Sequence, residues 1–249
     1  MTVAARFEIE YLQYLEPDGT LAAALPPAVA NAEALLPLFK RMLFVRTFDS
    51  KAIALQRTGK LGTYAACLGH EATHVGIGAS MQPEDVFAPS YREYGAQFER
   101  GVKPRDVLMY WGGDERGNDF EIPRNDYPWC VPISTQCLMA SGAALAFKLR
   151  GENRVAVATC GDGGSSKTDF YAAINSAGAF SLPLVLCVIN NGWAISVPRK
   201  AQTGAGTLAQ KGLAGGLHCL QVDGNDLVAV LEAMRRAHER ARSGQGGSV

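Results

Sequence analysis

The chain has 249 residues, of which 47% are hydrophobic and 19% are charged, so it has enough apolar material for a large globular core. Its 24 Lys and Arg residues balance its 24 Asp and Glu residues, and therefore no net field draws it toward nucleic acid or an anionic membrane. We expect small molecules or other proteins as partners, with no nucleic acid and no membrane.

The N-terminal segment and the cysteines favour a soluble, cytoplasmic protein. The segment MTVAARFEIEYLQYLEPDG has early acidic residues and no apolar run of signal-peptide length, and no later stretch is apolar enough to span a bilayer. The six cysteines include no C-x-x-C pair. We therefore expect reduced, buried thiols that serve packing rather than a disulfide framework.

Residues 1–30 are predicted to form an N-terminal arm and residues 31–249 a single domain. The arm has no clear period and ends in two prolines, which disfavour a helix. From Asn31, apolar residues recur at the spacing of one helix face, which predicts a helix to about Gln56. Similar patterns predict helices over 71–81, from Tyr94, and over 135–149 and 226–242, with a long surface loop over 111–129.

The segment 154–193 has the order strand, loop, helix, strand, loop. RVAVATC and LVLCVI are short apolar runs, and between them lie a glycine-rich loop and a segment with Phe170, Ala173 and Ile174 on one helix face. This order predicts a βαβ unit with two parallel strands, a right-handed crossover and helices on both faces. The fold class is therefore α/β with a mostly parallel sheet.

Asp162 and Asn191 each follow one of the two predicted strands. Because the carboxyl ends of parallel strands open on one edge of the sheet, both side chains should face one site. The glycines at 161, 163 and 164 allow a ligand close to the backbone, and the N-terminus of the next helix favours an anion such as a phosphate. Carboxylate and amide oxygens suit magnesium or calcium. A diphosphate held through magnesium fits this arrangement.

Two other interpretations of the same residues stay open at this point. The glycine-rich loop and the Asn-Asn-Gly sequence are also compatible with ordinary tight turns. A dinucleotide site of the G-x-G-x-x-G type fits less well, because Ser166 stands in the position of the third glycine and no acidic residue opens the loop after the next strand.

The stretch GDGGSSKTDFYAAINSAGAFSLPLVLCVINN resembles the thiamine-diphosphate signature, in which Gly-Asp-Gly precedes Asn-Asn by a fixed spacer. Asp162 and Asn191 are 29 residues apart, as that signature requires. The segments SYREYGAQFERGV, YWGGDERG, ALAFKLRGE, NNGWAISVPR, TLAQK and QVDGNDLVAV are similar to the alpha subunits of the thiamine-diphosphate-dependent 2-oxo acid dehydrogenases. The resemblance covers residues 35–245 and implies the thiamine-diphosphate-binding fold.

The resemblance also implies a magnesium and diphosphate site. The side chains of Asp162 and Asn191 and the backbone carbonyl of Trp193 would bind magnesium, and Gly163 and Gly164 would lie against the diphosphate. These roles assign thiamine diphosphate and magnesium as the cofactors.

Three further cofactor contacts are implied on other segments. Tyr91 and Arg92 would contact the cofactor, since an arginine can donate two parallel hydrogen bonds to a phosphate. Ile133 would meet the aminopyrimidine through its backbone. Taken alone, the Tyr-Arg pair is also compatible with an exposed helix start, and Ile133 with a core residue. The loop 132–136 is similar to a monovalent-cation site of branched-chain relatives, but Val131 replaces a liganding serine.

The activity implied is oxidative decarboxylation of a 2-oxo acid, between glycolysis and acetyl-CoA, with acyl transfer to a lipoyl-bearing acyltransferase. The overall similarity favours pyruvate, and a branched-chain 2-oxo acid is the alternative. In that family the cofactor carries the reaction, and the glutamate that activates its pyrimidine comes from a beta subunit of a heterotetramer. No catalytic acid or base is therefore assigned within this chain.

The chain departs from the family pattern in three places. Ala172 stands where many relatives have Glu, and Lys167-Thr168 replaces an acidic or Gln-Gly pair. The sequence stops at 246–249, where relatives continue through a strand into a histidine-bearing loop, so we expect a C-terminally truncated chain. A non-enzymatic subunit that binds the cofactor or its partner without turnover is therefore a further alternative.

A competing motif is H-E-x-x-H, formed by His70, Glu71 and His74. On a helix this spacing places two imidazoles on one face for zinc, with the glutamate as general base of a metalloprotease. The extended form of the motif is absent, and Glu93 is a possible third ligand only by its distance along the chain. The zinc interpretation is kept as a remote alternative.

Overall fold

A three-stranded parallel sheet lies at the centre of the chain in the computed structural model, which describes residues 2–28 and 31–249. The spatial order is β2 (Val86–Ala88), β3 (Ala156–Gly161) and β4 (Leu184–Ile189). Val157 of β3 lies opposite Phe87 on one side and Val185 on the other. The predicted parallel pair is confirmed, with α6 (Thr168–Ala179) connecting its two strands.

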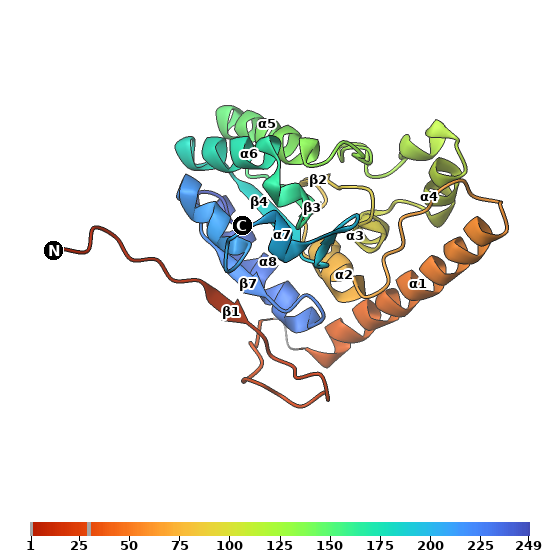
Figure 1. Ribbon diagram of the computed structural model, residues 1–249, viewed down its shortest axis with the longest axis horizontal. Helices are drawn as coiled ribbons and strands as arrows, with labels where there is room; N and C mark the ends of the chain where they lie inside the picture. The colour runs from red at the N-terminus through yellow and green to blue at the C-terminus, as the bar shows by residue number, and fades with distance from the viewer. Residues whose placement is uncertain (1, 29–30) are drawn as a thin grey trace.

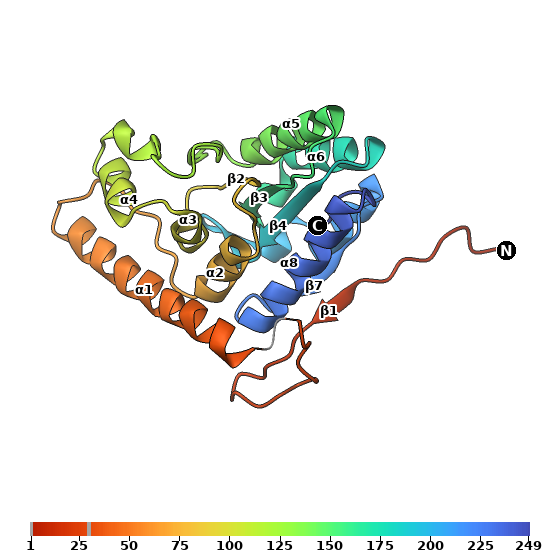
Figure 2. The same cartoon turned by 180° about the vertical axis from the view of Figure 1, so that it is seen from behind.

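Helices cover both faces of this sheet, as predicted (Figures 1 and 2). α5 (Thr135–Arg150) and α6 pack on one face, where Ala156 and Ala158 of β3 meet Phe170. α2 (Glu71–Ala79) and α8 (Leu227–Arg242) cover the other face, where Val157 and Val185 join a cluster with Met234. Because β3 is buried on both faces, its sequence is continuously apolar rather than alternating.

A second core lies beside the sheet, between α1 (Ala32–Arg57), α3 (Tyr94–Arg100) and α4 (Pro104–Trp111). The side chain of Asn31 accepts from the backbone amide of Glu33 at 2.9 Å and caps α1, so the predicted helix start is confirmed. The predicted loop 111–129 is irregular apart from the short 3-10 helix η1 (Glu115–Asn118).

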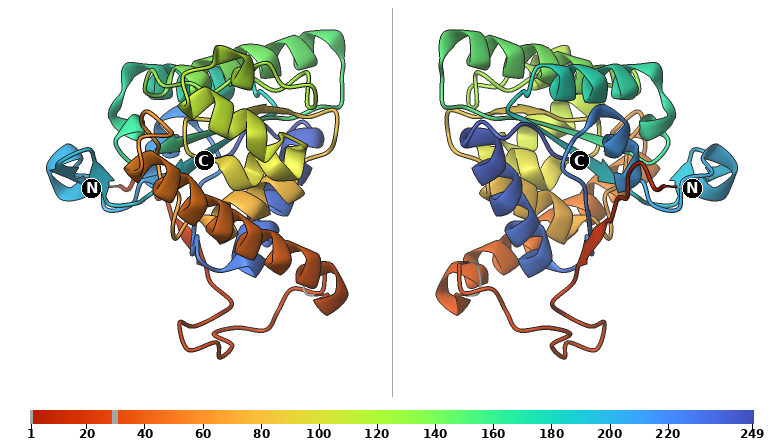
Figure 3. Two further views of the ribbon diagram at one scale, coloured as in Figure 1. Left: turned by 90° about the vertical axis from the view of Figure 1, so that its right-hand side faces the viewer. Right: turned by 90° about the vertical axis from the view of Figure 1, so that its left-hand side faces the viewer.

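The N-terminal segment packs on its own chain. Its strand β1 (Glu10–Leu12) pairs in parallel with β7 (Leu220–Val222), and the Asp226 carboxylate accepts from the backbone amides of Tyr14 and Leu15 at 2.7 and 2.8 Å. Figure 3 shows the chain from β1 to residue 28 looping away from the helices. The predicted boundary between arm and domain lies between residues 30 and 31; residue 30 is outside the described residues, and the division stays a prediction.

Asp226 also caps α8, because its other carboxylate oxygen accepts from the backbone amides of Val228 and Ala229. The remaining elements are the two-residue hairpin strands β5 (Trp193–Ala194) and β6 (Val197–Pro198), the short helix α7 (Arg199–Gln202), and the 3-10 helices η2 (Gly164–Ser166) and η3 (Ala209–Gly215).

All six cysteines are free and five are buried, which confirms the packing role predicted for them. In residues 2–28 and 31–249 no helix combines the length and the apolarity that a membrane span needs.

Candidate functional site

Asp162 begins the loop at the carboxyl end of β3. Its backbone amide donates to the carbonyl of Ile189 at 3.2 Å, so the loop starts beside the end of β4. The side chain is only 2% exposed. Its Oδ2 accepts from Gln202 Nε2 at 3.3 Å, whereas its buried Oδ1 has no hydrogen-bond partner among the described residues. A buried carboxylate oxygen without a donor is costly, and a hard cation would satisfy it.

The glycines after Asp162 stand where no side chain fits. A Cβ on Gly163 would lie 2.4 Å from the Cβ of Ala194, and a Cβ on Gly164 would lie 2.7 Å from Ser134 Oγ. Ser165 closes the turn, because its amide and its hydroxyl both donate to the Asp162 carbonyl, at 3.2 and 2.6 Å. The loop is therefore compact, and Ala194 and Ser134 pack against its glycines.

The segment after β4 reaches the same edge of the sheet. Asn191 is exposed, and its Oδ1 accepts from the backbone amide of Trp193 at 3.1 Å, while Gly192 adopts a φ of +83°. Such a turn requires glycine or a similar residue at that φ. The close approach of Gly163 to Ala194 brings this segment against the loop that Asp162 begins. The structure thus brings Asp162, Gly163 and the Asn191 segment together, as predicted from the strand order.

Tyr91 and Arg92 follow β2, the third strand that ends at this edge. The preceding Ser90 donates its backbone amide to Thr159 Oγ1 in β3 at 3.3 Å. The Arg92 guanidinium donates to the carbonyl of Ala66 and stands 5.5 Å from the centroid of the Tyr91 ring. Both side chains are half-buried. Among the described residues, no hydrogen bond or ion pair joins them to Asp162, so their cofactor role stays a prediction.

Ile133 is 44% exposed and therefore is not the core residue that its side chain alone would suggest. The next residue, Ser134, has a φ of +69° and donates its hydroxyl to the Gly164 carbonyl at 2.7 Å. This bond places the neighbouring Ile133 backbone beside the Asp162 loop. Ser134 and Gln202 were not singled out from the sequence, because no spacing rule connects either residue with Asp162.

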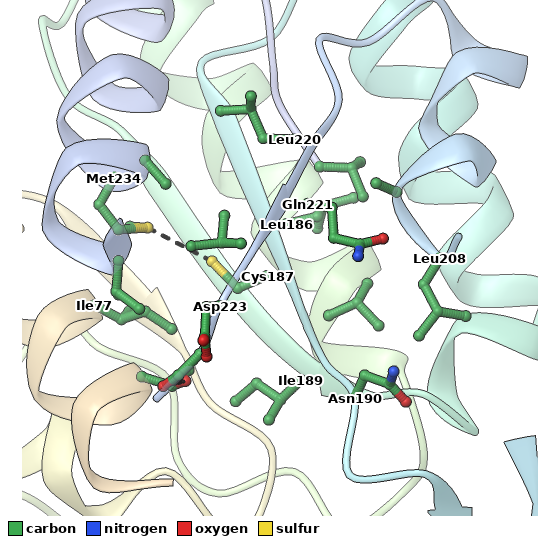
Figure 4. A pocket seen from close by; sticks show the side chains of 18 of the residues that line it. Ile77, Leu186, Cys187, Ile189, Asn190, Leu208, Leu220, Gln221, Asp223 and Met234 are labelled. Carbon is green, nitrogen blue, oxygen red and sulfur yellow. Dashed lines mark hydrogen bonds between the residues drawn. The ribbon is translucent and has the colours of Figure 1, made fainter. Parts of the chain in front are cut away.

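A cavity of about 480 Å³ lies between β4 and β7. Figure 4 shows Cys187 and Ile189 from β4, Leu220 and Gln221 from β7, and Met234 from α8 around it. None of the residues predicted to bind thiamine diphosphate or magnesium, all of which the structure describes, lines it. The cavity is therefore a different place from the Asp162 loop.

Of the H-E-x-x-H residues, Glu71 is held by hydrogen bonds. Nδ1 of His70 and both ring nitrogens of His74 are buried and have no hydrogen-bond partner among the described residues. The Glu71 carboxylate pairs with Arg46 at 2.9 and 3.0 Å and also accepts from the Gly69 amide at 3.1 Å. Burial alone would raise the pKa of Glu71, but these hydrogen bonds and the Arg46 charge lower it. Burial, followed by the charges of His70 and Arg92, holds the pKa of His74 well below its ordinary value. Glu71 is thus an ion-pair partner of Arg46.

The described residues 2–28 and 31–249 contain no group of three or more His, Cys, Asp or Glu side chains placed to hold a metal ion. Glu93, considered as a third zinc ligand, is buried and accepts from Ser90 Oγ at 2.8 and 2.9 Å. Both observations disfavour the zinc interpretation.

We expect no stoichiometric zinc in the purified protein, because a structural or catalytic zinc site needs at least three protein ligands. Elemental analysis after purification without added metal measures it. One zinc per chain that is lost in His70→Ala but kept in the control His218→Ala would overturn this expectation in favour of a metallohydrolase.

A comparison with protein families decides the affiliation of the chain. The family model described as the dehydrogenase E1 component matches residues 39–249. The chain belongs to this family. The E1 family region therefore includes the sheet and all the candidate site residues.

Relatives of this E1 chain are named as alpha subunits. It is 41% identical over 217 residues to the pyruvate dehydrogenase E1 component subunit alpha of Acholeplasma laidlawii. The aligned region covers 87% of this chain and 63% of the relative. It is 38% identical over 243 residues to the subunit of the same name from Staphylococcus aureus strain Mu50, covering 97% of this chain and 65% of the relative. The chain thus spans slightly less than two-thirds of the length of these relatives.

A solved structure with some similarity is an enzyme from Mycobacterium smegmatis whose description names it as thiamin diphosphate-dependent. The TM-score is 0.44 at 19% identity, over 67% of this chain and 29% of that one. This similarity is too low to support an argument about function.

Proposed function

We propose that this chain is the alpha subunit of a pyruvate dehydrogenase E1 component and binds thiamine diphosphate through magnesium. The buried Asp162 Oδ1, which has no hydrogen-bond partner in the described part of the chain, carries the proposal, because it stands at the sheet edge where ligands of α/β proteins bind. The names of the relatives support the substrate and the subunit type.

Asp162, Asn191 and Trp193 would hold the magnesium ion. Asn191 Oδ1 already accepts one hydrogen bond from the Trp193 amide, but a carboxamide oxygen has two lone pairs and can also bind a cation. The carboxylate and carbonyl oxygens of this set are the donors that magnesium prefers. The donor set therefore fits the metal.

Gly163 and Gly164, which directly follow Asp162, would lie against the diphosphate, since a glycine backbone permits close approach of a ligand. The Arg92 guanidinium would add positive charge, and Tyr91 would contact the cofactor beside it. Ile133 would meet the aminopyrimidine through its backbone, which Ser134 fixes to the loop.

Thiamine diphosphate, when bound, supplies the chemistry that breaks the bond between the 2-oxo carbon and the carboxylate. This chain's residues bind and orient it: Asp162 through the metal, and the glycine loop through the diphosphate. No catalytic acid or base is assigned in this chain. We propose that a beta subunit supplies that group in a heterotetramer, and that the acyl group passes to a lipoyl-bearing acyltransferase.

Substrate choice tests this function. We expect the chain together with a beta subunit to release carbon dioxide from pyruvate with a kcat/KM at least about tenfold above that for branched-chain 2-oxo acids, the discrimination that one or two methylene groups provide. The reverse preference would establish the branched-chain alternative. Binding of the cofactor without turnover of any 2-oxo acid would instead indicate a non-catalytic subunit.

A further inference from the structure

Lys211 places a buried ammonium group next to the loop that begins at Asp162 and contains Gly163 and Gly164, here called the diphosphate loop. It belongs to η3 and is only 6% exposed. Its Nζ donates to the carbonyl and to the hydroxyl of Ser165, both at 2.9 Å, and lies 3.5 Å from Ser166 Oγ. These oxygens belong to the turn that follows Asp162.

The oxygens that Lys211 contacts are neutral. Within the described ranges, no ion pair includes Lys211, and its other neighbour is the ring of Tyr171, whose centroid is 5.7 Å from Nζ. Burial lowers the pKa of the ammonium and the charge of Arg199 adds to that shift, while Cys160 and Asp162 oppose it. A buried charge without a hydrogen-bonded counter-charge is unfavourable. An anion that binds nearby would therefore stabilise the buried Lys211 charge.

Two hydrogen bonds connect Lys211 with Asp162. The Ser165 hydroxyl donates to the Asp162 carbonyl at 2.6 Å, so its lone pairs are available to accept from Lys211. The base of Lys211 is also fixed, because η3 packs tightly on α6: a Cβ on Gly178 would lie 1.6 Å from the carbonyl oxygen of Gly215. The ammonium thus holds the turn that sets the position of the Asp162 backbone.

We propose that Lys211 is a positioning residue for the diphosphate loop, and that its buried charge is balanced when thiamine diphosphate binds. The inference rests on the proposed function. A diphosphate and Asp162 together carry more negative charge than one magnesium ion cancels, so a nearby fixed cation favours the bound state. In a buried site this attraction is stronger than in water.

Calorimetric titration with thiamine diphosphate and excess magnesium, on the chain with its beta subunit, tests the proposal. Lys211→Met is expected to raise the Kd at least about tenfold, the loss that follows removal of a buried charge-assisted contact. The midpoint of thermal unfolding without cofactor should not fall, because an uncompensated charge is removed. Lys211→Arg should recover most of the affinity.

The matched control is Lys148→Met. Lys148 is an exposed residue of α5. Its ammonium also donates to backbone carbonyls, those of Phe180 and Ser181, which directly follow α6 at the end away from the Asp162 loop. It should bind the cofactor as the parent does.

Affinity within twofold of the parent in Lys211→Met would overturn the proposal, and so would a loss that Lys211→Arg does not recover. If Lys211→Met does not fold, Lys211→Gln is judged by the same criterion. A parent that binds no thiamine diphosphate would refute the proposed function itself, whereas a parent that binds and a variant that matches it would refute the role of Lys211 alone.

Discussion

Asp162→Ala is expected to weaken the magnesium-dependent binding of thiamine diphosphate by at least about 100-fold, the upper end of what loss of a group supporting a metal site costs. The reason is the buried Oδ1, which has no hydrogen-bond partner among the described residues and which a magnesium ion would satisfy. Calorimetric titration with thiamine diphosphate in excess magnesium measures the change.

The control for this variant is Asp169→Ala. Asp169 lies in α6, close after the same loop, but its carboxylate accepts from Thr135 Oγ1 at 3.0 Å. It should bind the cofactor within about threefold of the parent, since changes away from the site seldom exceed about 0.5 kcal/mol. The unfolding midpoint of Asp162→Ala should not fall, because a buried carboxylate that lacks a full set of donors is removed. Parent-like affinity in Asp162→Ala would remove this residue from the metal site.

The second large effect is a dependence of turnover on the beta subunit. With thiamine diphosphate and magnesium supplied, this chain alone should release carbon dioxide from pyruvate at least about 1,000-fold more slowly than the chain with a beta subunit, within the range that a positioned acid or base contributes. The residues proposed for the site would hold the metal and the diphosphate. Ile133 would meet the pyrimidine only through its backbone, and no acid or base of this chain is assigned to it.

Carbon dioxide release by the chain, by the beta subunit and by the mixture measures this effect. Only the mixture should turn over. Comparable turnover by the chain alone would mean that the catalytic base lies in this sequence. The buried Glu93, whose pKa burial raises, would then be the first residue to replace.

The central βαβ unit was predictable from the sequence, because β3 and β4 are each six residues long and follow clear turn residues. β2 was not predicted. It has three residues, Val86–Ala88, between two prolines, and its strand geometry depends on pairing with β3, which comes about 70 residues later. The pairing of β1 with β7 depends in the same way on tertiary contact, and no local pattern could indicate it.

The site was predictable where strand order determines it. Asp162 and Asn191 could be placed together because parallel strands end at one edge. Ser134 and Lys211 could not, since they lie 30 and 46 residues along the chain from the loop residues they contact. Their positions depend on the unusual φ of Ser134 and on the packing of η3 against α6.

The central claim is that Asp162 and Asn191 hold thiamine diphosphate through magnesium. The dependence of cofactor binding on magnesium tests it most directly. Thiamine diphosphate is titrated into the chain with its beta subunit, first in excess magnesium and then in a chelator. We expect affinity to fall at least about 100-fold in chelator, as in Asp162→Ala, and to return when magnesium is restored, because Asp162 and Asn191 can hold a diphosphate only through a cation. Undiminished affinity in chelator would contradict the magnesium site and the function built on it.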